Sequence, residues 1–306
     1  MIIDYPCNIH KKKLEICISF KNWDTGKNEN KYFNPNEVQE LILTRGNSSV
    51  SGSIFKLNPN LNIMFFSEGK PIANVLPMNK IPKILKNEEL FYKLSKHKKR
   101  KLAWIFCKAV CSQRIKVISR LNETRNNKIV KQELIQMRKL DKKLSKAKTN
   151  EELMGIEGNI AKKFYFCLSN FNKLFNVKRN RFNKDIVNCL MNLSHTIIRN
   201  KIKYRLFIKG ISPHHSFLHK RDNRNEDYLV WDFSEFWVAY CDKLIFYALE
   251  RRIIKENDII DGKLKMNEKN KIIKLVDKRI SNEIIDNKIN KFIGYLKGKN
   301  RFSWTQ

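Results

Sequence analysis

Short runs of apolar residues fill the first part of the chain and predict β-strands. They are rich in β-branched and aromatic side chains and cover residues 15–20, 40–44, 51–57, 62–66 and 71–77. Turn-forming residues separate the runs, as in "RGNSS", "NPN" and "SEGKP". The run at 51–57 also fits a single helical turn. The pattern therefore predicts a small β-rich region at the N-terminus.

Beyond the two prolines of "PMNKIPK" (77–83), apolar residues recur at helical spacing over long stretches. The predicted helices cover residues 87–121, 128–146, 150–171, 184–210, 231–257 and 268–297. Together these patterns predict an α+β protein. A small N-terminal β-rich domain, residues 1–82, precedes a larger all-α domain, residues 83–306.

The charge balance changes the picture, because the chain is strongly basic. Its 306 residues include 62 Lys and Arg against 30 Asp and Glu, a formal charge of +32. This excess indicates a polyanionic partner, with nucleic acid first. The alternative is the lysine-rich composition that an AT-rich genome produces without a function attached. Two clusters are candidate DNA contacts, or else solvated helix faces: Lys96, Lys98, Lys99 and Arg100 in "KHKKRK", and Lys178, Arg179 and Arg181 in "KRNRFNK".

Cysteine spacing and the N-terminus indicate the compartment. Seven cysteines without a paired spacing predict reduced thiols rather than a disulfide framework or a zinc site. The start "MIIDYPCNIHKKK" places its charges after a short apolar stretch, the reverse of a secretory signal. No uncharged apolar stretch is long enough to cross a bilayer. We expect a cytoplasmic protein without a membrane span.

Acidic residues gather in one segment of this basic chain, "FLHKRDNRNEDYLVWDFSEF" (217–236), which has His219 near its head. Asp232 and Glu235 are three residues apart at a predicted helix start and share a face. Acids in a first helical turn also complement the helix dipole, which is an ordinary structural role. A histidine beside aromatic residues is commonly a packing residue. Both interpretations of this segment stay open at this point.

A third acid, Glu157, lies within the predicted helix 150–171 and is followed by Gly158. Glycine in a helix costs on the order of 1 kcal/mol relative to alanine. A close approach by another backbone, a metal or a DNA phosphate would explain it; alone, Glu157 also fits a solvated residue. Together Glu157, His219 and Asp232 offer two carboxylates and an imidazole, which suit Mn²⁺ or Mg²⁺. Such a cation would serve phosphoryl chemistry on DNA.

Four sequence blocks, in this order, resemble one known family. The blocks "LMGIEGNIAKKFYF", "DIVNCLMNLSHTIIRN", "KGISPHHSFLH" and "LVWDFSEFW" are similar to those of the CRISPR-associated (Cas) spacer-acquisition integrases. The resemblance covers roughly residues 38–297. It implies a β-rich domain joined to a helical catalytic domain. It also implies that Glu157, His219 and Asp232 are metal ligands, with Glu235 beside them as a second acid.

The resemblance further implies a reaction and partners. The family is a metal-dependent DNA endonuclease and integrase that uses Mn²⁺ or Mg²⁺. It joins the 3′-OH ends of short duplex DNA to a CRISPR leader–repeat by transesterification. It works as homodimers, two of which flank a dimer of a small CRISPR-associated partner protein. A liganding His219 must be neutral, so activity is expected to fall at acid pH.

The chain departs from the family pattern at five positions. Ser212 replaces an aspartate, Ser216 a glycine, Phe164 a tyrosine, Trp237 an arginine and His195 a tyrosine. None of these changes removes a predicted metal ligand, but Trp237 and His195 replace residues expected to position the substrate. Three other functions stay open: a casposon-type transposase, a non-catalytic nucleic-acid-binding scaffold and a repair-type nuclease that hydrolyses without joining.

Overall fold

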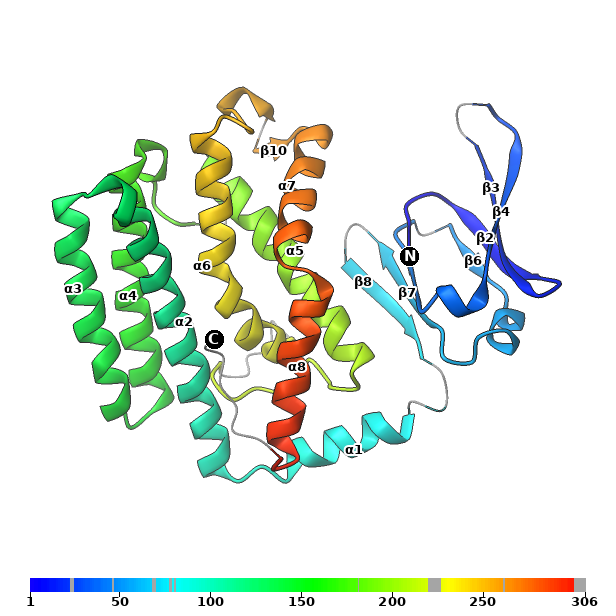
Figure 1. The fold of residues 1–306 in the computed structure, drawn as a ribbon, viewed down its shortest axis with the longest axis horizontal. Coiled ribbons are helices and arrows are strands. Elements are labelled where there is room, and N and C mark those ends of the chain that lie inside the picture. Colours follow the sequence, from blue (N-terminus) through cyan, green and yellow to red (C-terminus); the bar gives the residue numbers. More distant parts are fainter. Residues whose placement is uncertain are drawn as a thin grey trace. The chain divides into compact units, whose positions relative to one another are not determined.

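A computed structural model describes residues 1–22, 25–45, 47–67, 70–76, 79, 81–180, 182–219, 227–260 and 262–299. The chain forms two compact units, drawn in Figure 1. One contains Met1–Glu89 with Ile208–Ile211, and the other contains Leu90–Phe207 with Ser212–Gln306. Strands dominate the first and helices the second, as the α+β prediction requires. The division at residue 82 stays a prediction, as do the roles expected of the two parts: dimerisation and partner contacts for residues 1–82, and metal-dependent catalysis and DNA binding for residues 83–306.

The first unit contains two four-stranded sheets. One has the order β1-β5-β7-β8, with bounds Ile2–Ile3, Glu40–Leu43, Asn62–Ser67 and Lys70–Val75. Its first three strands are parallel, and β8 pairs antiparallel with β7. The other has the order β4-β3-β2-β6, with bounds Asn28–Phe33, Glu15–Lys21, Cys7–Lys12 and Ser49–Val50. It is antiparallel except for the parallel pair of β2 and β6.

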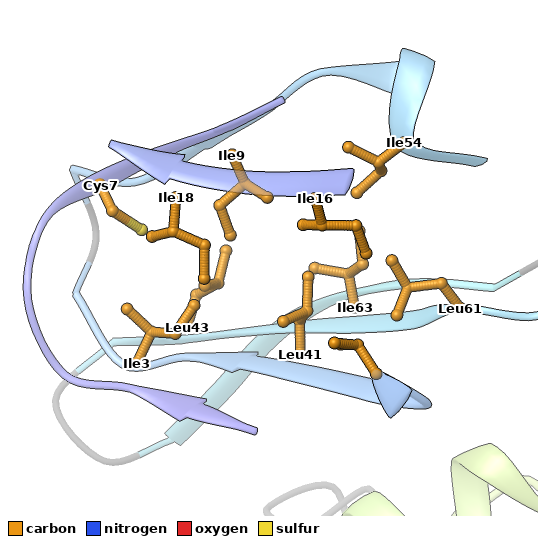
Figure 2. Close-up of a cluster of buried hydrophobic side chains, with 11 residues drawn as sticks. Ile3, Cys7, Ile9, Ile16, Ile18, Leu41, Leu43, Ile54, Leu61 and Ile63 are labelled. Carbon is orange, nitrogen blue, oxygen red and sulfur yellow. The ribbon is translucent and has the colours of Figure 1, made fainter. Parts of the chain in front are cut away.

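Apolar side chains from both sheets meet in the core of this unit. Figure 2 shows Ile9, Ile16 and Ile18 from β2 and β3 opposite Leu41 and Leu43 from β5. All five side chains are buried. β-branched and leucine side chains of this kind pack well on a pleated surface. Their burial supplies the hydrophobic free energy that holds the two sheets together.

Four of the five predicted apolar runs contain strands, β3, β5, β7 and β8. The run at 51–57 is instead the helical turn that its sequence also allowed, a 3-10 helix at Gly52–Lys56. Ser51 caps this turn by accepting a hydrogen bond from the Ser53 N–H. Strand β4 was not predicted because its sequence, "NENKYF", is polar and mostly exposed. Its hydrogen bonds to β3, not an apolar face, make it a strand.

The described residues contain eight α-helices. They are α1 (Ile81–Tyr92), α2 (Lys96–Arg125), α3 (Lys128–Lys143), α4 (Asn150–Phe171), α5 (Ile186–Ile208), α6 (Tyr228–Glu250), α7 (Met266–Arg279) and α8 (Asn282–Leu296). A two-strand pair, β9 (Ile259–Ile260) and β10 (Lys263–Leu264), follows α6. Helix α2 packs against α4 and α6, and α3 packs against α2 and α4. Figure 1 shows α2 beside α3 and α4.

Two helices predicted as continuous are each divided, which corrects the predictions for 87–121 and 268–297. Helix α1 ends at Tyr92, and the Ser95 hydroxyl accepts the Lys98 N–H to begin α2. In the same way, Ser281 accepts the Ile284 N–H at the start of α8. A serine side chain that satisfies a free N–H stabilises a helix start by about 1 kcal/mol. The apolar spacing continues across both breaks, so periodicity alone does not reveal them.

Two further features concern the cysteines and the membrane-span prediction. All seven cysteines are free. Among the described residues, no helix combines the length and the apolar character needed to cross a bilayer.

The core between the two sheets gives a stability prediction. Ile16→Ala removes a fully buried side chain and leaves a cavity, so we expect the free energy of unfolding to fall by about 2–5 kcal/mol. Leu14→Ala, in the turn beside it, removes a side chain that is 78% exposed and should change stability by less than about 0.5 kcal/mol. Urea unfolding of both variants measures the difference. Equal losses would contradict the assignment of Ile16 to the core.

Candidate active site

Asp232, in the first turns of α6, is a buried carboxylate that organises the segment before it. The side chain is 0% exposed. Its oxygens accept hydrogen bonds from the backbone N–H groups of Phe217 at 3.2 Å, Leu218 at 3.3 Å and His219 at 3.3 Å. A buried carboxylate is stable only when such donors replace water. Asp232 therefore fixes the backbone of residues 217–219 against α6.

His219 is held by the same carboxylate. Its Nδ1 lies 2.6 Å from Asp232 Oδ1. Burial lowers the pKa of His219, but the hydrogen bond to Asp232 and the charges of Asp232, Glu235 and Glu157 outweigh it, so the pKa is raised above 6.5. The carboxylates thus favour the protonated imidazole. The three predicted ligands and Glu235 therefore share one electrostatic environment.

The acids are also joined by a residue that the sequence analysis did not select, Arg114 of α2. Its guanidinium forms an ion pair with Glu157 Oε1 of α4 and lies 3.6 Å from Glu235 Oε2 of α6. Burial lowers the pKa of Arg114, but the charges of Glu157 and Glu235 raise it by more, so the net shift of the pKa is upward. The guanidinium stays charged and neutralises part of the acidic group.

A sequence signal for Arg114 existed. Cys107, Cys111, Arg114 and Ile118 are spaced four, three and four residues apart on α2, and all four side chains are buried. This is the spacing of one helix face. A charged residue on a buried face requires a partner of opposite charge. The position of Arg114 therefore predicts buried acids on neighbouring helices, although it does not say which.

These side chains suit a divalent cation by their chemistry. Carboxylates and an imidazole are donors that Mn²⁺ accepts, and Mg²⁺ accepts the carboxylates. As the side chains lie, however, no group of three His, Cys, Asp or Glu among the described residues is arranged to hold a metal ion. Arg114 supplies the positive charge between Glu157 and Glu235 instead. A bound cation would compete with this guanidinium for the same carboxylates.

Gly158 is not needed to make room for another segment of this chain among the described residues. A Cβ added there would meet no atom within 4 Å, leaving out its chain neighbours and the nearby backbone of its own helix. Among the described residues no other backbone approaches this position, so a close approach within this chain does not explain the glycine beside Glu157. The open space leaves the explanations that invoke a metal or a DNA phosphate as predictions.

A cavity of about 550 Å³ is lined by His219 and by part of the first basic cluster, "KHKKRK". Its lining includes three of the predicted DNA contacts, Lys96, Lys99 and Arg100. Lys98 is exposed at the start of α2, outside this lining. Asp232 holds the backbone of His219, so the basic side chains and a fixed His219 line the same cavity.

The second basic cluster lies before α5. Lys178 is exposed. Arg179 donates hydrogen bonds to Asn188 Oδ1 and Asn192 Oδ1, each at 2.9 Å. Arg181 lies outside the described residues. The DNA contacts of both clusters stay predictions.

The departures from the family pattern are mostly interior residues. Phe164 and Trp237 are buried. The buried His195 has its Nε2 2.8 Å from Asp242 Oδ1, and the neighbour of Phe164, Tyr165, donates to Asp242 Oδ2 at 3.0 Å. Burial first, and then the charge of Asp242, raises the pKa of Tyr165 well above 10.0. These side chains form a satisfied polar network between α4, α5 and α6.

Comparison with known families identifies the chain. The sequence model described as "CRISPR associated protein Cas1" matches residues 1–278. The chain belongs to the Cas1 family. This confirms the resemblance found in the four sequence blocks.

Individual Cas1 relatives are distant. A CRISPR-associated endonuclease Cas1 of Clostridium perfringens is 25% identical over 163 residues, which cover 50% of this chain and 49% of the relative. One from Archaeoglobus fulgidus is 24% identical over 252 residues, covering 73% of this chain and 71% of the relative. The match to the first of these thus spans about half of its length.

Solved structures show the same fold. A casposase bound to integration product has a TM-score of 0.70 at 18% identity, covering 100% of this chain and 93% of that one. A Cas1 protein from Thermotoga maritima has a TM-score of 0.69 at 18% identity, covering 100% and 99%. A chain of a partial Cas6-RT-Cas1–Cas2 complex has a TM-score of 0.71 at 14% identity, covering 100% of this chain and 98% of that one. At these identities the similarity establishes the fold and not the reaction.

The raised pKa of His219 gives a prediction for the metal-free protein. We expect an NMR titration of its ring to give a pKa above 6.5, and Asp232→Asn to lower it. Because the folded pKa lies above the unfolded value, the pair stabilises the fold fully below about 6.5 and loses that contribution as pH rises through the folded pKa. Urea unfolding across this range should show the loss in the parent and not in Asp232→Asn. An unchanged His219 pKa in the variant would contradict the assignment.

Proposed function

We propose that this Cas1-family chain is a metal-dependent DNA endonuclease and integrase. It joins the 3′-OH ends of short duplex DNA to a CRISPR leader–repeat by transesterification during spacer acquisition. One observation carries the proposal: His219, Asp232, Glu157 and Glu235, from three separate segments, share one electrostatic environment beside a basic cavity. Acidic ligands for a cation next to cations for DNA are the two requirements of strand transfer on phosphodiesters.

The residues have different roles in this reaction. Glu157, His219 and Asp232 would hold Mn²⁺ or Mg²⁺, with Glu235 as the nearby second acid. The cation supplies polarisation of the target phosphate and stabilises charge on the attacking and leaving oxygens. Asp232 engages Nδ1 of His219 and so orients the ring, which leaves Nε2 as the nitrogen for a ligand. Arg114 pairs with Glu157 and Glu235 and so holds both carboxylates in place.

The partners follow from the charge and the relatives. Lys96, Lys99 and Arg100 would contact the DNA backbone on the wall of the cavity beside His219. A structural relative is part of a complex whose name contains Cas1 and Cas2, which supports a small Cas2-type partner for this chain. We propose that the chain acts as a homodimer with this partner in the cytoplasm.

A casposon-type transposase is the second candidate, because a casposase shares the fold. The casposase bound to integration product matches the fold with a TM-score of 0.70, against 0.69 for the Thermotoga maritima Cas1 protein. The two scores do not separate the functions. The proposed chemistry is the same in both, and the difference lies in which DNA is joined to which target.

Strand joining tests the reaction. Purified protein is incubated with Mn²⁺, supercoiled plasmid and labelled duplex oligonucleotides with free or blocked 3′ ends, with and without the Cas2-type partner. We expect label to join the plasmid only from free 3′-OH ends. His219→Ala should reduce joining by at least roughly a hundredfold, the size typical of losing one stabilising group at a reaction centre. The matched control is His214→Ala, an exposed histidine in the same segment, which should join at the parent rate.

Each other outcome identifies a rival function. Nicking without joining, even with the partner present, would indicate a hydrolytic nuclease. DNA binding without any cleavage, equal in the parent and His219→Ala, would indicate a scaffold. Joining of transposon ends in preference to short duplexes would favour the casposon reading.

Metal binding is measured separately from activity. We expect Mn²⁺ to bind the DNA-free protein in an electron paramagnetic resonance titration, and Glu157→Gln to weaken binding by at least about tenfold, since even supporting residues change metal affinity by that much. Glu151→Gln, at the start of the same helix, is the control and should bind like the parent. Equal affinity in Glu157→Gln and the parent would remove Glu157 from the ligand set.

A further inference from the structure

Arg199 of α5 is held in a fixed position beside the candidate site. Its guanidinium carbon lies 3.6 Å from the centre of the Trp231 ring. Trp231 directly precedes Asp232 on α6 and lies one helical turn before Glu235, on the same face. The Nε of Arg199 is buried and has no hydrogen-bond partner. The stacked ring therefore fixes the guanidinium without using its N–H groups.

Arg179 is also held in place, in its case by hydrogen bonds. Its two terminal nitrogens donate to the amide oxygens of Asn188 and Asn192 on α5. Asn188 is itself held by Asp185, which accepts from its backbone N–H at 2.9 Å and its side chain at 2.7 Å. Amide oxygens orient a guanidinium but do not cancel its charge. The positive charge of Arg179 is thus placed without being neutralised by these partners.

Asn192, whose amide oxygen holds Arg179, and Arg199 are seven residues apart on α5, so the two arginines lie along one face of that helix. Burial lowers the pKa of Arg199, the nearby charge of Arg179 lowers it too, and the carboxylate of Glu235 opposes both. Among the described residues, neither guanidinium forms an ion pair with a carboxylate. Two like charges held near one another in a partly buried place repel unless an anion lies between them. The carboxylates nearby are already engaged, because Arg114 pairs with both Glu157 and Glu235.

We infer that Arg179 and Arg199 together bind one phosphate of the DNA strand that lies beside Glu235. The inference rests on the proposed function, because it names how that site holds its substrate. Guanidinium groups suit this ligand, since their planar N–H forks match phosphate oxygens. Stacking on Trp231 uses the face of Arg199 and leaves the fork at its edge for the phosphate.

The two arginines are positioning residues rather than catalytic ones. The described contacts of Arg199 and Arg179 are with Trp231, Asn188 and Asn192, and not with the three proposed metal ligands. A phosphate bound here is a neighbour of the reacting phosphate along the same strand, and holding it restricts how the reacting bond is presented. The sequence pattern of the family places no expectation on Arg199, and the basic-cluster argument selected only Arg179.

Salt dependence of DNA binding tests the site without any reaction. Duplex DNA with blocked 3′ ends is titrated with the parent, Arg179→Met and Arg199→Met between about 50 and 300 mM salt. Each phosphate contact contributes about 0.9 to the slope of log affinity against log salt. We expect each variant to lose about that slope, and roughly eightfold in affinity at 0.1 M salt. The double variant should lose the same slope as either single variant, because both residues bind one phosphate.

Arg251→Met is the matched control. Arg251 is an exposed arginine whose guanidinium lies 5.5 Å from the Tyr247 ring at the other end of α6. It should leave the slope unchanged. Thermal unfolding checks that every variant folds. If Arg199→Met does not fold, Arg199→Lys keeps the charge but loses the fork, and should slow strand joining at saturating DNA while keeping most of the slope.

The outcomes separate this inference from the function on which it rests. Loss of slope in both variants, in a parent protein that joins no DNA, would support the phosphate site and reject the integrase. Normal joining with an unchanged slope in Arg179→Met and Arg199→Met would overturn the phosphate site and keep the integrase. Additive slope losses in the double variant would mean two separate phosphates and overturn the shared site. A last outcome is that inorganic phosphate raises the melting temperature of the parent while the salt slope of DNA binding is equal in the parent and in all variants. That result would indicate a site for a free anion and would overturn the DNA assignment.

Discussion

The buried charge of Arg114 is the constraint on which the helical unit depends. A guanidinium with 4% exposure cannot rely on water, so the fold must bring carboxylates to it. Removing one partner of such a buried pair costs about 3–5 kcal/mol, because the other charge is left uncompensated. Glu157 of α4 and Glu235 of α6 meet this requirement, and α2 packs against both helices. The packing of α2 against α4 and α6 therefore also brings the two acids to Arg114.

Asp232 imposes a second requirement that leads directly to His219. Its buried oxygens take three backbone N–H groups from residues 217–219, so this irregular segment has one conformation. Apolar packing supports the same conformation, because the Phe217 ring lies 4.6 Å from that of Phe106 and 6.1 Å from that of Phe292. Asn150 also donates to the carbonyl of Phe217 at 2.7 Å. The imidazole is thereby held on a rigid support before any ligand arrives, which a precise reaction requires.

The arrangement of charges explains how a basic protein keeps an acidic site. Acids and arginines alternate in space: Glu157 and Glu235 meet Arg114, and Glu235 also acts on Arg199. The arginines offset the negative charge of the carboxylates, and the surrounding lysines add a positive field that would attract a polyanion. A site of bare carboxylates would repel DNA. Interleaving the two signs allows both a cation and a phosphate to approach the same place.

Much of the organisation could be read from the sequence, because it depends on local patterns. Apolar runs with turn residues gave the strands β3, β5, β7 and β8, and helical spacing gave the helices of the second unit. Strands β1, β2, β4 and β6 and the helix breaks before α2 and α8 were missed, since they depend on sheet pairing and on single serine caps. The acids and His219 were selected because they are unusual against a basic background and match the family blocks.

What the sequence determined by itself is the family, the order of a β-rich region before a helical one, and the acids and histidine that carry the candidate chemistry. Only the tertiary structure decided that Arg114 lies between Glu157 and Glu235, that Asp232 holds His219, and that Arg199 stacks on Trp231. These pairs are separated by up to 121 positions along the chain, as for Arg114 and Glu235. Periodicity records which face of a helix is buried, but it contains no information on which other helix covers that face. That choice is made by packing and by the pairing of buried charges, and both exist only in the folded chain.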